Sequence, residues 1–390
     1  MMEMQCTCEK KYHSAPVKTI EVSEHALEKT AQILKDYHRV YLVCDENTYA
    51  AAGQRVEQLL REAGSLSHTC ILPADAMATA ENVGDVLIHA GIPEKPFDIN
   101  HFSVNPDYVL AVGSGSVNDI CRMVSYRLGL EYGICGTAPS MDGFASVVAP
   151  LVVQNRKFVY DCTIARHIII DLSVCAQAPY ELLEAGVGDM VGKYVALLDW
   201  EISRLLNGEY YCEKIASDVL AAADRCVEAA FRLPERRPED VRCIVDGLIC
   251  SGMGIAYAGT TRPASGAEHM IAQTWEIMDF ENHRKNNLHG IEVGEGTLAA
   301  IAMFRRLRQE CPDERICALI DRYLPRFDTI CALQEKIRMP FANNDRAIFT
   351  EGVIRGRTFR ERYTVLQYLY DRGMLEDYAD YAFAETMKYQ

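Results

Sequence analysis

Short runs of β-branched and other apolar residues recur along the first half of this chain, and stretches with helical character separate them. The runs are Arg39–Cys44, His68–Leu72, Tyr108–Val112, Tyr132–Cys135 and His167–Asp171. Strands that are apolar along nearly their whole length must be buried on both faces, and helices between such strands provide that cover. The pattern therefore predicts an α/β domain with a mostly parallel sheet.

The second half of the chain has a different pattern. From Val187 to Leu198 the apolar residues recur three and four positions apart, which is typical of a helix, and similar patterns continue to the C-terminus. A chain of 390 residues is too long for one compact core. The sequence therefore predicts two domains, an α/β domain over residues 1–180 and an all-helical domain over residues 181–390.

Charge and composition exclude several classes of function. The formal net charge of −15 disfavours binding to nucleic acid or to an anionic membrane surface. The N-terminus has no apolar core of signal-peptide length and no apolar stretch is as long as a membrane span, so we expect a cytoplasmic protein. The 15 cysteines follow no framework spacing, and most should be small core residues. Cys6 and Cys8 supply only half of a tetrahedral metal site, and we predict none there.

A glycine-containing loop follows the third predicted strand. It runs Gly113-Ser-Gly-Ser-Val-Asn-Asp119 and opens a predicted helix. Glycines let the backbone approach a phosphate, and the N-terminus of a helix offers unpaired N–H groups and a positive dipole end. The third glycine of the dinucleotide fingerprint is absent, so the loop could also be a simple tight connection. Its position between strand and helix favours phosphate binding.

Polar side chains also follow two other predicted strands. Thr137, Ser140 and Asp142 lie in the loop after the fourth strand, and Asp45 ends the first. Serine and aspartate are common turn formers, so each residue alone says little. Because the carboxyl ends of parallel strands meet at one edge of a sheet, we expect these side chains to gather where ligands of such sheets bind.

A candidate metal site lies in the helical half. Asp189 is a carboxylate with glycines around it, and His269 and His289 flank a predicted helix and turn. One carboxylate and two imidazoles suit Zn²⁺, Ni²⁺ or Fe²⁺ and leave positions open for substrate. Spacing alone leaves two alternatives, since His283 competes with His289 and Glu268 competes with Asp189.

Taken together, these motifs resemble the sn-glycerol-1-phosphate dehydrogenases, and the similarity is greatest to their bacterial branch. That family lies in the superfamily of iron-containing alcohol dehydrogenases and dehydroquinate synthase. The resemblance covers roughly residues 20 to 300 in order, while the last part of the chain carries no recognisable motif. The motifs are Val112–Arg122, Thr137–Gly143 with Ser146, Gly188–Tyr194 with Asp199-Trp200, Ser265–His269 with Trp275-Glu276, and Leu288–Gly290.

The resemblance implies a dehydroquinate synthase-like fold and a metal-dependent reduction of glycerone phosphate to sn-glycerol 1-phosphate by NAD(H) or NADP(H). It assigns the metal ligands to Asp189, His269 and His289, and a substrate-binding, catalytic role to Asp142. Lys193 lies four residues after Asp189, on the same helix face, and is a candidate partner for the substrate phosphate. The implied dinucleotide contacts are Asp45, Gly113, Ser114, Gly115, Ser116, Val117, Thr137, Ala138, Pro139, Ser140 and Ser146.

One position departs from the family pattern. Four residues after the first metal histidine the family often carries a second histidine that contacts substrate, and this chain has Gln273. Glutamine can hydrogen-bond a substrate oxygen but cannot donate a proton as an imidazolium does. The nearest alternative is therefore a dehydrogenase of another polyol or polyol phosphate. Two further alternatives from other classes are a dehydroquinate synthase-like cyclase and a nucleotide-sensing protein on the same fold. The expected partners are a small phosphorylated keto or hydroxy substrate and further copies of the chain, with no nucleic acid and no membrane.

Overall fold

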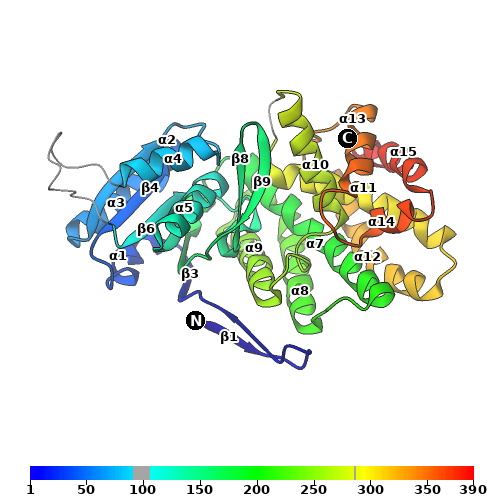
Figure 1. Cartoon of the computed structure of the whole chain (residues 1–390), viewed down its shortest axis with the longest axis horizontal. Helices are drawn as coiled ribbons and strands as arrows, with labels where there is room; N and C mark the ends of the chain where they lie inside the picture. Colours follow the sequence, from blue (N-terminus) through cyan, green and yellow to red (C-terminus); the bar gives the residue numbers. More distant parts are fainter. Residues whose placement is uncertain (91–105, 285–286) are drawn as a thin grey trace. The chain divides into compact units, whose positions relative to one another are not determined.

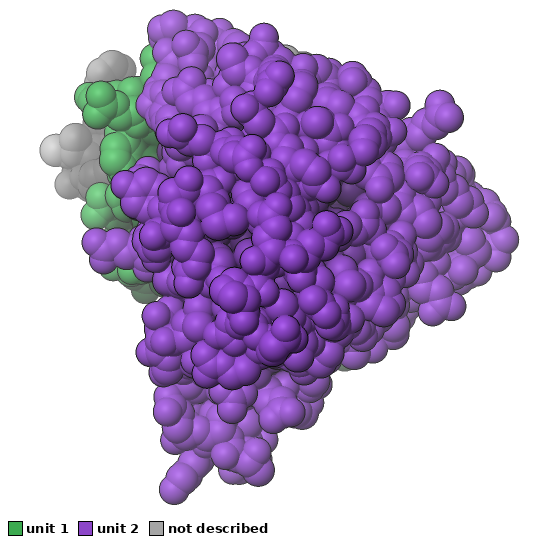
Figure 2. All heavy atoms as spheres, turned by 90° about the vertical axis from the view of Figure 1, so that its right-hand side faces the viewer, with its two compact units in different colours: residues 1–3, 14–179 green, residues 4–13, 180–390 purple. Residues whose placement is uncertain are grey.

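The computed structural model describes residues 1–90, 106–284 and 287–390. They form two compact units, one of residues 1–3 and 14–179 and the other of residues 4–13 and 180–390 (Figure 2). We call these the α/β unit and the helical unit. The chain passes from one to the other between Pro179 and Tyr180. Residues 4–13, which the sequence analysis assigned to the first domain, group with the helical unit.

The α/β unit contains a six-stranded sheet in the order β3-β10-β7-β6-β4-β5, in which every neighbouring pair is parallel. Several of its strands and helices are labelled in Figure 1. All five predicted strands are present, which confirms the predicted α/β class. The elements in chain order are β1 (Met2–Gln5), β2 (Tyr12–Ala15), β3 (Thr19–Ser23), η1 (Ala26–Lys29), α1 (Thr30–Ile33), β4 (Val40–Asp45), α2 (Glu46–Thr48), η2 (Tyr49–Gly53), α3 (Gln54–Glu62), β5 (Leu66–Leu72), α4 (Ala80–His89), β6 (Tyr108–Gly113), α5 (Gly115–Leu128), β7 (Glu131–Gly136), η3 (Asp142–Ala145), β8 (Val148–Val153), β9 (Arg156–Asp161), β10 (His167–Asp171) and α6 (Leu172–Cys175).

Alternate side chains of the central strands enter two different packing layers. Leu42 of β4 belongs to the cluster that also contains Val56 and Leu60 of α3. Tyr41, its neighbour on the strand, must point to the opposite face, and its hydroxyl donates to the carbonyl of Val86 in α4 at 3.0 Å. Helices therefore cover both faces of the sheet, as the apolar runs predicted.

Five of these strands were not predicted, namely β1, β2, β3, β8 and β9. β3 is a short edge strand whose residues are all half-buried, so it lacks the continuous apolar run of its neighbours. β8 and β9 form an antiparallel hairpin whose turn residues, Gln154 and Asn155, have φ angles of 50° and 58°. Two consecutive residues with positive φ are typical of a two-residue hairpin turn. The asparagine was a usable signal for that turn, and the sequence analysis missed it.

The helical unit is built on α7, a buried helix of 28 residues. The predicted all-helical half is thus confirmed. Among the described residues, α9 alone is long and apolar enough to cross a membrane, and 67% of its most apolar window is buried within the protein, as in a core helix. The elements are α7 (Tyr180–Asn207), α8 (Glu213–Ala230), η4 (Leu233–Glu235), α9 (Pro238–Ala258), α10 (Ala267–Glu281), α11 (His289–Glu310), α12 (Glu314–Ile337), α13 (Arg346–Gly356), α14 (Val365–Tyr370), α15 (Leu375–Thr386) and η5 (Met387–Tyr389).

Candidate functional site

Three predicted metal ligands meet in the helical unit. Asp189 comes from α7, His269 from α10 and His289 from the first position of α11. One ligand atom from each lies within 4.8 Å of the others. His283, the alternative to His289, is exposed and is not part of this group. The three residues are 80 and 20 positions apart in sequence, so only the packing of these helices brings them together.

Glycines allow α7 and α11 to cross closely enough to bring Asp189 and His289 together. A Cβ atom added at Gly188 would lie 2.1 Å from the carbonyl oxygen of Gly290, and one added at Gly290 would lie 1.8 Å from that of Ala185. No side chain fits at such distances. Asp189 and His289 are the sequence neighbours of these two glycines, so the close crossing places them side by side.

Each histidine of the group is hydrogen-bonded to a carboxylate through its other ring nitrogen. His269 Nδ1 donates to Glu268 Oε1 at 2.7 Å, and His289 Nδ1 donates to Glu276 Oε1 at 2.7 Å. This arrangement fixes the tautomer, because the proton on Nδ1 leaves the Nε2 lone pair available to a metal ion. Glu268 is therefore a hydrogen-bond partner of His269 and does not belong to the group in place of Asp189. The sequence analysis quoted Glu276 only as part of a motif.

Lys193 is completely buried and belongs to the same group. Its Nζ donates to Asp189 Oδ1 at 2.6 Å and to the carbonyl of Ala264 at 3.2 Å. Burial alone would raise the pKa of Asp189, but the charge of Lys193 and the hydrogen bond from His269 lower that pKa well below its ordinary value. Asp189 therefore stays ionised in the interior. Lys193 was predicted as a phosphate partner, and here its partner is the carboxylate.

The group fits a divalent cation. His269 Nε2 lies 3.3 Å from Asp189 Oδ1, and both atoms are electron-rich when the tautomer is the one above. Lys193 already offsets part of the charge of this oxygen, and a proton or a metal ion shared by the two atoms would make their short separation favourable. Burial and Lys193 lower the pKa of His269, but hydrogen bonds to Asp189 and Glu268 outweigh them and raise it overall. His289 is 24% exposed, so one side of the group is open to a substrate.

Asp199 anchors the helix that carries His269. This fully buried carboxylate accepts from the N–H of Ala267 at 2.8 Å and from the N–H of Val365 at 2.7 Å, which are the first residues of α10 and α14. Burial and repulsion by Glu268 raise its pKa to about 7, although the two backbone hydrogen bonds act in the opposite direction. The sequence analysis quoted Asp199 without a role, and its structural role is to cap two helices at once.

In the α/β unit the two predicted loops lie side by side. β6 pairs with β7, and the N–H of Thr137 donates to the carbonyl of Gly113 at 3.0 Å. The hydroxyls of Ser114 and Ser140 are 2.7 Å apart. Ser116 and Val117 belong to the first turn of α5. The second loop, which follows β7 and contains Thr137 and Ser140, therefore lies beside the N-terminus of this helix. This is the juxtaposition that parallel pairing of the strands predicted.

The second loop is held by a buried arginine. Arg122 of α5 donates to the carbonyls of Gly143 and Val148, the latter at 2.7 Å, and to the hydroxyl of Tyr132 at 2.8 Å. The loop that contains Ala138, Pro139 and Asp142 is therefore fixed to the helix at its far end. The sequence analysis quoted Arg122 within a motif and assigned it no role.

The remaining predicted residues have local partners. Asp45 ends β4 and caps the following helix, with its Oδ1 accepting from the N–H of Thr48 at 2.8 Å. Ser146 Oγ accepts from the N–H of Val148 at 3.1 Å. Gln273 lies one turn after His269 on α10, and its Oε1 is a buried atom with no hydrogen-bond partner among the described residues. An unpaired buried amide oxygen is available to a ligand.

Comparison with known proteins identifies the class. A sequence model described as iron-containing alcohol dehydrogenase matches residues 21–179. The crystal structure of glycerol dehydrogenase from Schizosaccharomyces pombe is 17% identical, covers 96% of this chain and 91% of its own, and superposes with a TM-score of 0.66. An iron-containing alcohol dehydrogenase from Thermotoga maritima is 14% identical, with 93% and 99% of the chains covered and a TM-score of 0.64. The fold is that of the iron-containing alcohol dehydrogenases.

Curated relatives narrow this class. A glycerol-1-phosphate dehydrogenase [NAD(P)+] from Bacillus subtilis is 32% identical over 323 residues, which is 80% of this chain and 79% of the relative. One from Bacillus licheniformis is 28% identical over 383 residues, or 95% and 93% of the two chains. The chain belongs to the glycerol-1-phosphate dehydrogenase family within the iron-containing alcohol dehydrogenase superfamily, as its motifs predicted.

Proposed function

We propose that this chain reduces glycerone phosphate to sn-glycerol 1-phosphate, reversibly, with NADH or NADPH and one divalent metal ion. The observation that carries the proposal is the group of Asp189, His269 and His289, in which a carboxylate backs each imidazole. It occurs in a chain whose relatives are named glycerol-1-phosphate dehydrogenase [NAD(P)+]. Zn²⁺, Ni²⁺ and Fe²⁺ all suit one carboxylate and two imidazoles.

When bound, the metal ion supplies a Lewis acid that polarises a carbonyl group. The chain prepares its ligands for that role. Glu268 and Glu276 hold the protons on Nδ1 of the two histidines, so both Nε2 atoms keep a lone pair that would be available to the ion. Lys193 balances the buried charge of Asp189, and it must leave that carboxylate if it is to reach a substrate phosphate. We therefore assign Lys193 mainly to charge balance.

The cofactor is assigned to the α/β unit. Its pyrophosphate is placed at the N-terminus of α5, on the backbone of Gly113 to Val117, because that helix end provides N–H donors and a positive dipole. Thr137 to Ser140 and Ser146 line the neighbouring loop. Asp45 is assigned to the ribose, where a carboxylate disfavours a 2′-phosphate, so NAD(H) is the preferred cofactor. In this scheme residues 1–180 bind the dinucleotide and residues 181–390 bind metal and substrate, with Asp142 of the first range as an additional substrate contact.

Substrate contacts are assigned to Asp142 and Gln273. Asp142 accepts a hydrogen bond from a substrate hydroxyl and orients it. The unpaired Oε1 of Gln273 accepts a second one. Because glutamine replaces a residue that could donate a proton, a second candidate function is the dehydrogenation of another polyol or polyol phosphate.

The proposal is tested by following NADH absorbance with a panel of keto-sugar phosphates while the metal content of the protein is measured. Stoichiometric oxidation with glycerone phosphate supports the first function, and oxidation with only another substrate supports the second. A cyclase or a nucleotide sensor oxidises no net NADH.

Removal of a proposed ligand tests the metal. His269→Ala leaves two ligands, so both metal content and activity should fall. His283→Ala removes an exposed histidine outside the group and is the matched control. Full activity of a metal-free preparation would contradict the assignment.

Cellular location and assembly are part of the same proposal. We place the chain in the cytoplasm as a homo-oligomer, with the homodimer as the expected form. All 15 cysteines are free in the structure, which suits a reducing compartment. Light scattering of the purified protein and fractionation of cells measure the two properties directly.

A further inference from the structure

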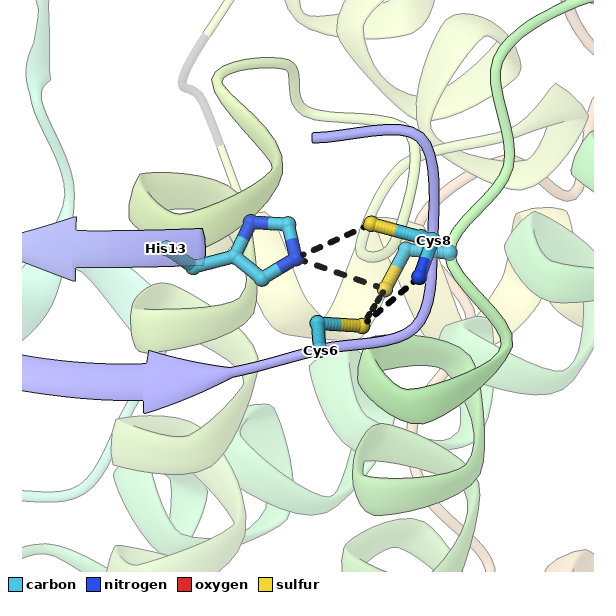
Figure 3. A group of neighbouring side chains, drawn as sticks. Cys6, Cys8 and His13 are labelled. Carbon is cyan, nitrogen blue, oxygen red and sulfur yellow. Dashed lines mark hydrogen bonds between the residues drawn. The ribbon is translucent and has the colours of Figure 1, made fainter. Parts of the chain in front are cut away.

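A second group of metal-binding side chains lies at the N-terminal end of the helical unit. Cys6 and Cys8 come from the loop between β1 and β2, His13 from β2, and Cys212 from the residue that precedes α8. One ligand atom from each of the four lies within 4.8 Å of the others. Figure 3 shows the ring of His13 turned toward the cysteine sulfur atoms.

The spacing of these atoms matches the edges of a tetrahedral zinc site. Zinc binds cysteine sulfur at about 2.3 Å and histidine nitrogen at about 2.0 Å, so neighbouring ligand atoms are about 3.5 to 3.8 Å apart. Cys6 Sγ and Cys212 Sγ are 3.5 Å apart. His13 Nε2 lies 3.3 Å from Cys8 Sγ and 3.6 Å from Cys212 Sγ. A disulfide would need a sulfur–sulfur distance of about 2.05 Å and would involve only two of the four residues.

Surrounding groups prepare the ligands. His13 Nδ1 donates to the carbonyl of Tyr257 at 2.8 Å, which leaves the Nε2 lone pair facing the sulfur atoms. The backbone N–H of Cys8 points at Cys6 Sγ, with 3.4 Å between the two atoms. An N–H donor of this kind stabilises a thiolate. Metal-ligating histidines almost always donate their second ring N–H to a carboxylate, a backbone carbonyl or water, and His13 has the carbonyl form of this arrangement.

A positively charged side chain also lies near this group of ligands. Three thiolates and one Zn²⁺ ion carry a net charge of −1. Lys10, in the same loop, donates to the carbonyl of Ala258 at 2.5 Å and lies 4.4 Å from the centre of the Tyr210 ring. The hydroxyl of Tyr210 is 3.7 Å from Cys8 Sγ, so the ammonium group and the thiolates share one neighbour.

We propose that Cys6, Cys8, His13 and Cys212 bind one Zn²⁺ ion as a closed structural site that fixes residues 4–13 to α8 and α9. Four protein ligands leave no position for substrate, which is typical of a structural rather than a catalytic zinc. The site explains why residues 4–13 group with the helical unit although the residues on both sides of them belong to the α/β unit. It is independent of the function proposed for Asp189 and its partners.

Cobalt substitution tests the proposal. Co²⁺ bound by thiolates absorbs strongly in the near ultraviolet through sulfur-to-metal charge transfer, and a carboxylate with two imidazoles does not. The reduced full-length protein loaded with Co²⁺ should show this band. Cys8→Ser and Cys212→Ser each remove one of the three thiolates and weaken cobalt binding, so each should reduce the band by at least about a third, and His269→Ala should retain it. Cys243→Ser, which changes a half-buried cysteine outside the group, is the matched control and should also retain it.

Proteolysis gives a second readout that needs no variant. Lys10 and Lys11 are exposed, so trypsin can cut after them when the loop opens. Free Zn²⁺ at about one hundred times its dissociation constant should slow that cleavage about a hundredfold, because only the closed loop binds the ion. A chelator should restore fast cleavage. Absence of the thiolate band in the folded wild type, or cleavage that is independent of Zn²⁺, would overturn the proposal.

Discussion

The crossing of α7 and α11 allows one prediction to be worked out quantitatively. In Gly290→Ala the new Cβ would lie 1.8 Å from the carbonyl oxygen of Ala185, and in Gly188→Ala it would lie 2.1 Å from that of Gly290. Favourable contacts between such atoms begin near 3.5 Å, so each distance is short by about 1.5 Å. Both obstacles are backbone atoms, and no side-chain rotation relieves them. The helices must therefore separate.

The expected effects are a loss of stability and a loss of metal. Overpacking of this kind costs about 1–3 kcal/mol, and the higher helix propensity of alanine returns at most about 1 kcal/mol, so we expect a net loss of up to about 3 kcal/mol in the free energy of unfolding. Metal–ligand distances tolerate changes of only about 0.2 Å. A helix shift of about 1 Å at Asp189 and His289 should therefore release most of the metal even where the fold survives.

Urea unfolding followed by tryptophan fluorescence measures the stability, because both tryptophans of the chain, Trp200 and Trp275, are buried in the helical unit. Elemental analysis measures the metal. The matched control is Gly247→Ala in α9, whose Cβ would meet only the flexible end of Met190 at 3.0 Å. If Gly290→Ala were as stable as this control and kept its metal, the close crossing would not be what holds the two ligands together.

Three further predictions concern other parts of the chain. Burial raises the pKa of Glu295 to about 7. As pH rises from about 4.5 to 7, the free energy of unfolding of the wild type should therefore fall by up to about 3 kcal/mol relative to that of Glu295→Gln. Urea unfolding of both proteins across this pH range measures the difference. The sign follows because the folded state binds the proton more tightly than the unfolded state. Gly115→Val should abolish NADH binding in a fluorescence titration while metal content is unchanged. Gln273→His should add an ionisation near pH 6–7 to the profile of kcat/KM for glycerone phosphate.

The sequence predicted those parts of the fold that depend on local pattern. Four of the six sheet strands, β4, β6, β7 and β10, were predicted because nearly all of their residues are apolar and buried. The two edge strands have weaker patterns, and β5 was predicted from its apolar end at Cys70–Leu72, whereas β3 has no comparable apolar run. The strand pairing then placed the loops at Gly113 and Thr137 together, since consecutive parallel strands often pair. These conclusions rest on residues that are close in sequence.

Contacts between residues that are distant in sequence could not be predicted from local sequence patterns. Cys6 and Cys8 were judged to be half of a site because the other half, Cys212, lies about two hundred positions away. For the same reason nothing in the spacing of Asp199 indicated that it caps α10 and α14. The burial of Lys193 against Asp189 could have been suspected from their separation of four residues, which places them on one helix face.

Helix α7 restricts how relatives of this chain can differ in length. Asp189, Lys193 and Asp199 all lie on this one helix, and each must face its own partner. One inserted or deleted residue rotates everything beyond it by about 100° and shifts it by about 1.5 Å along the axis. No insertion between Asp189 and Asp199 can preserve all three contacts, so evolutionary changes in chain length should be absent from this stretch. They should concentrate in surface connections such as the turn between β8 and β9, where an extra residue disturbs no buried partner.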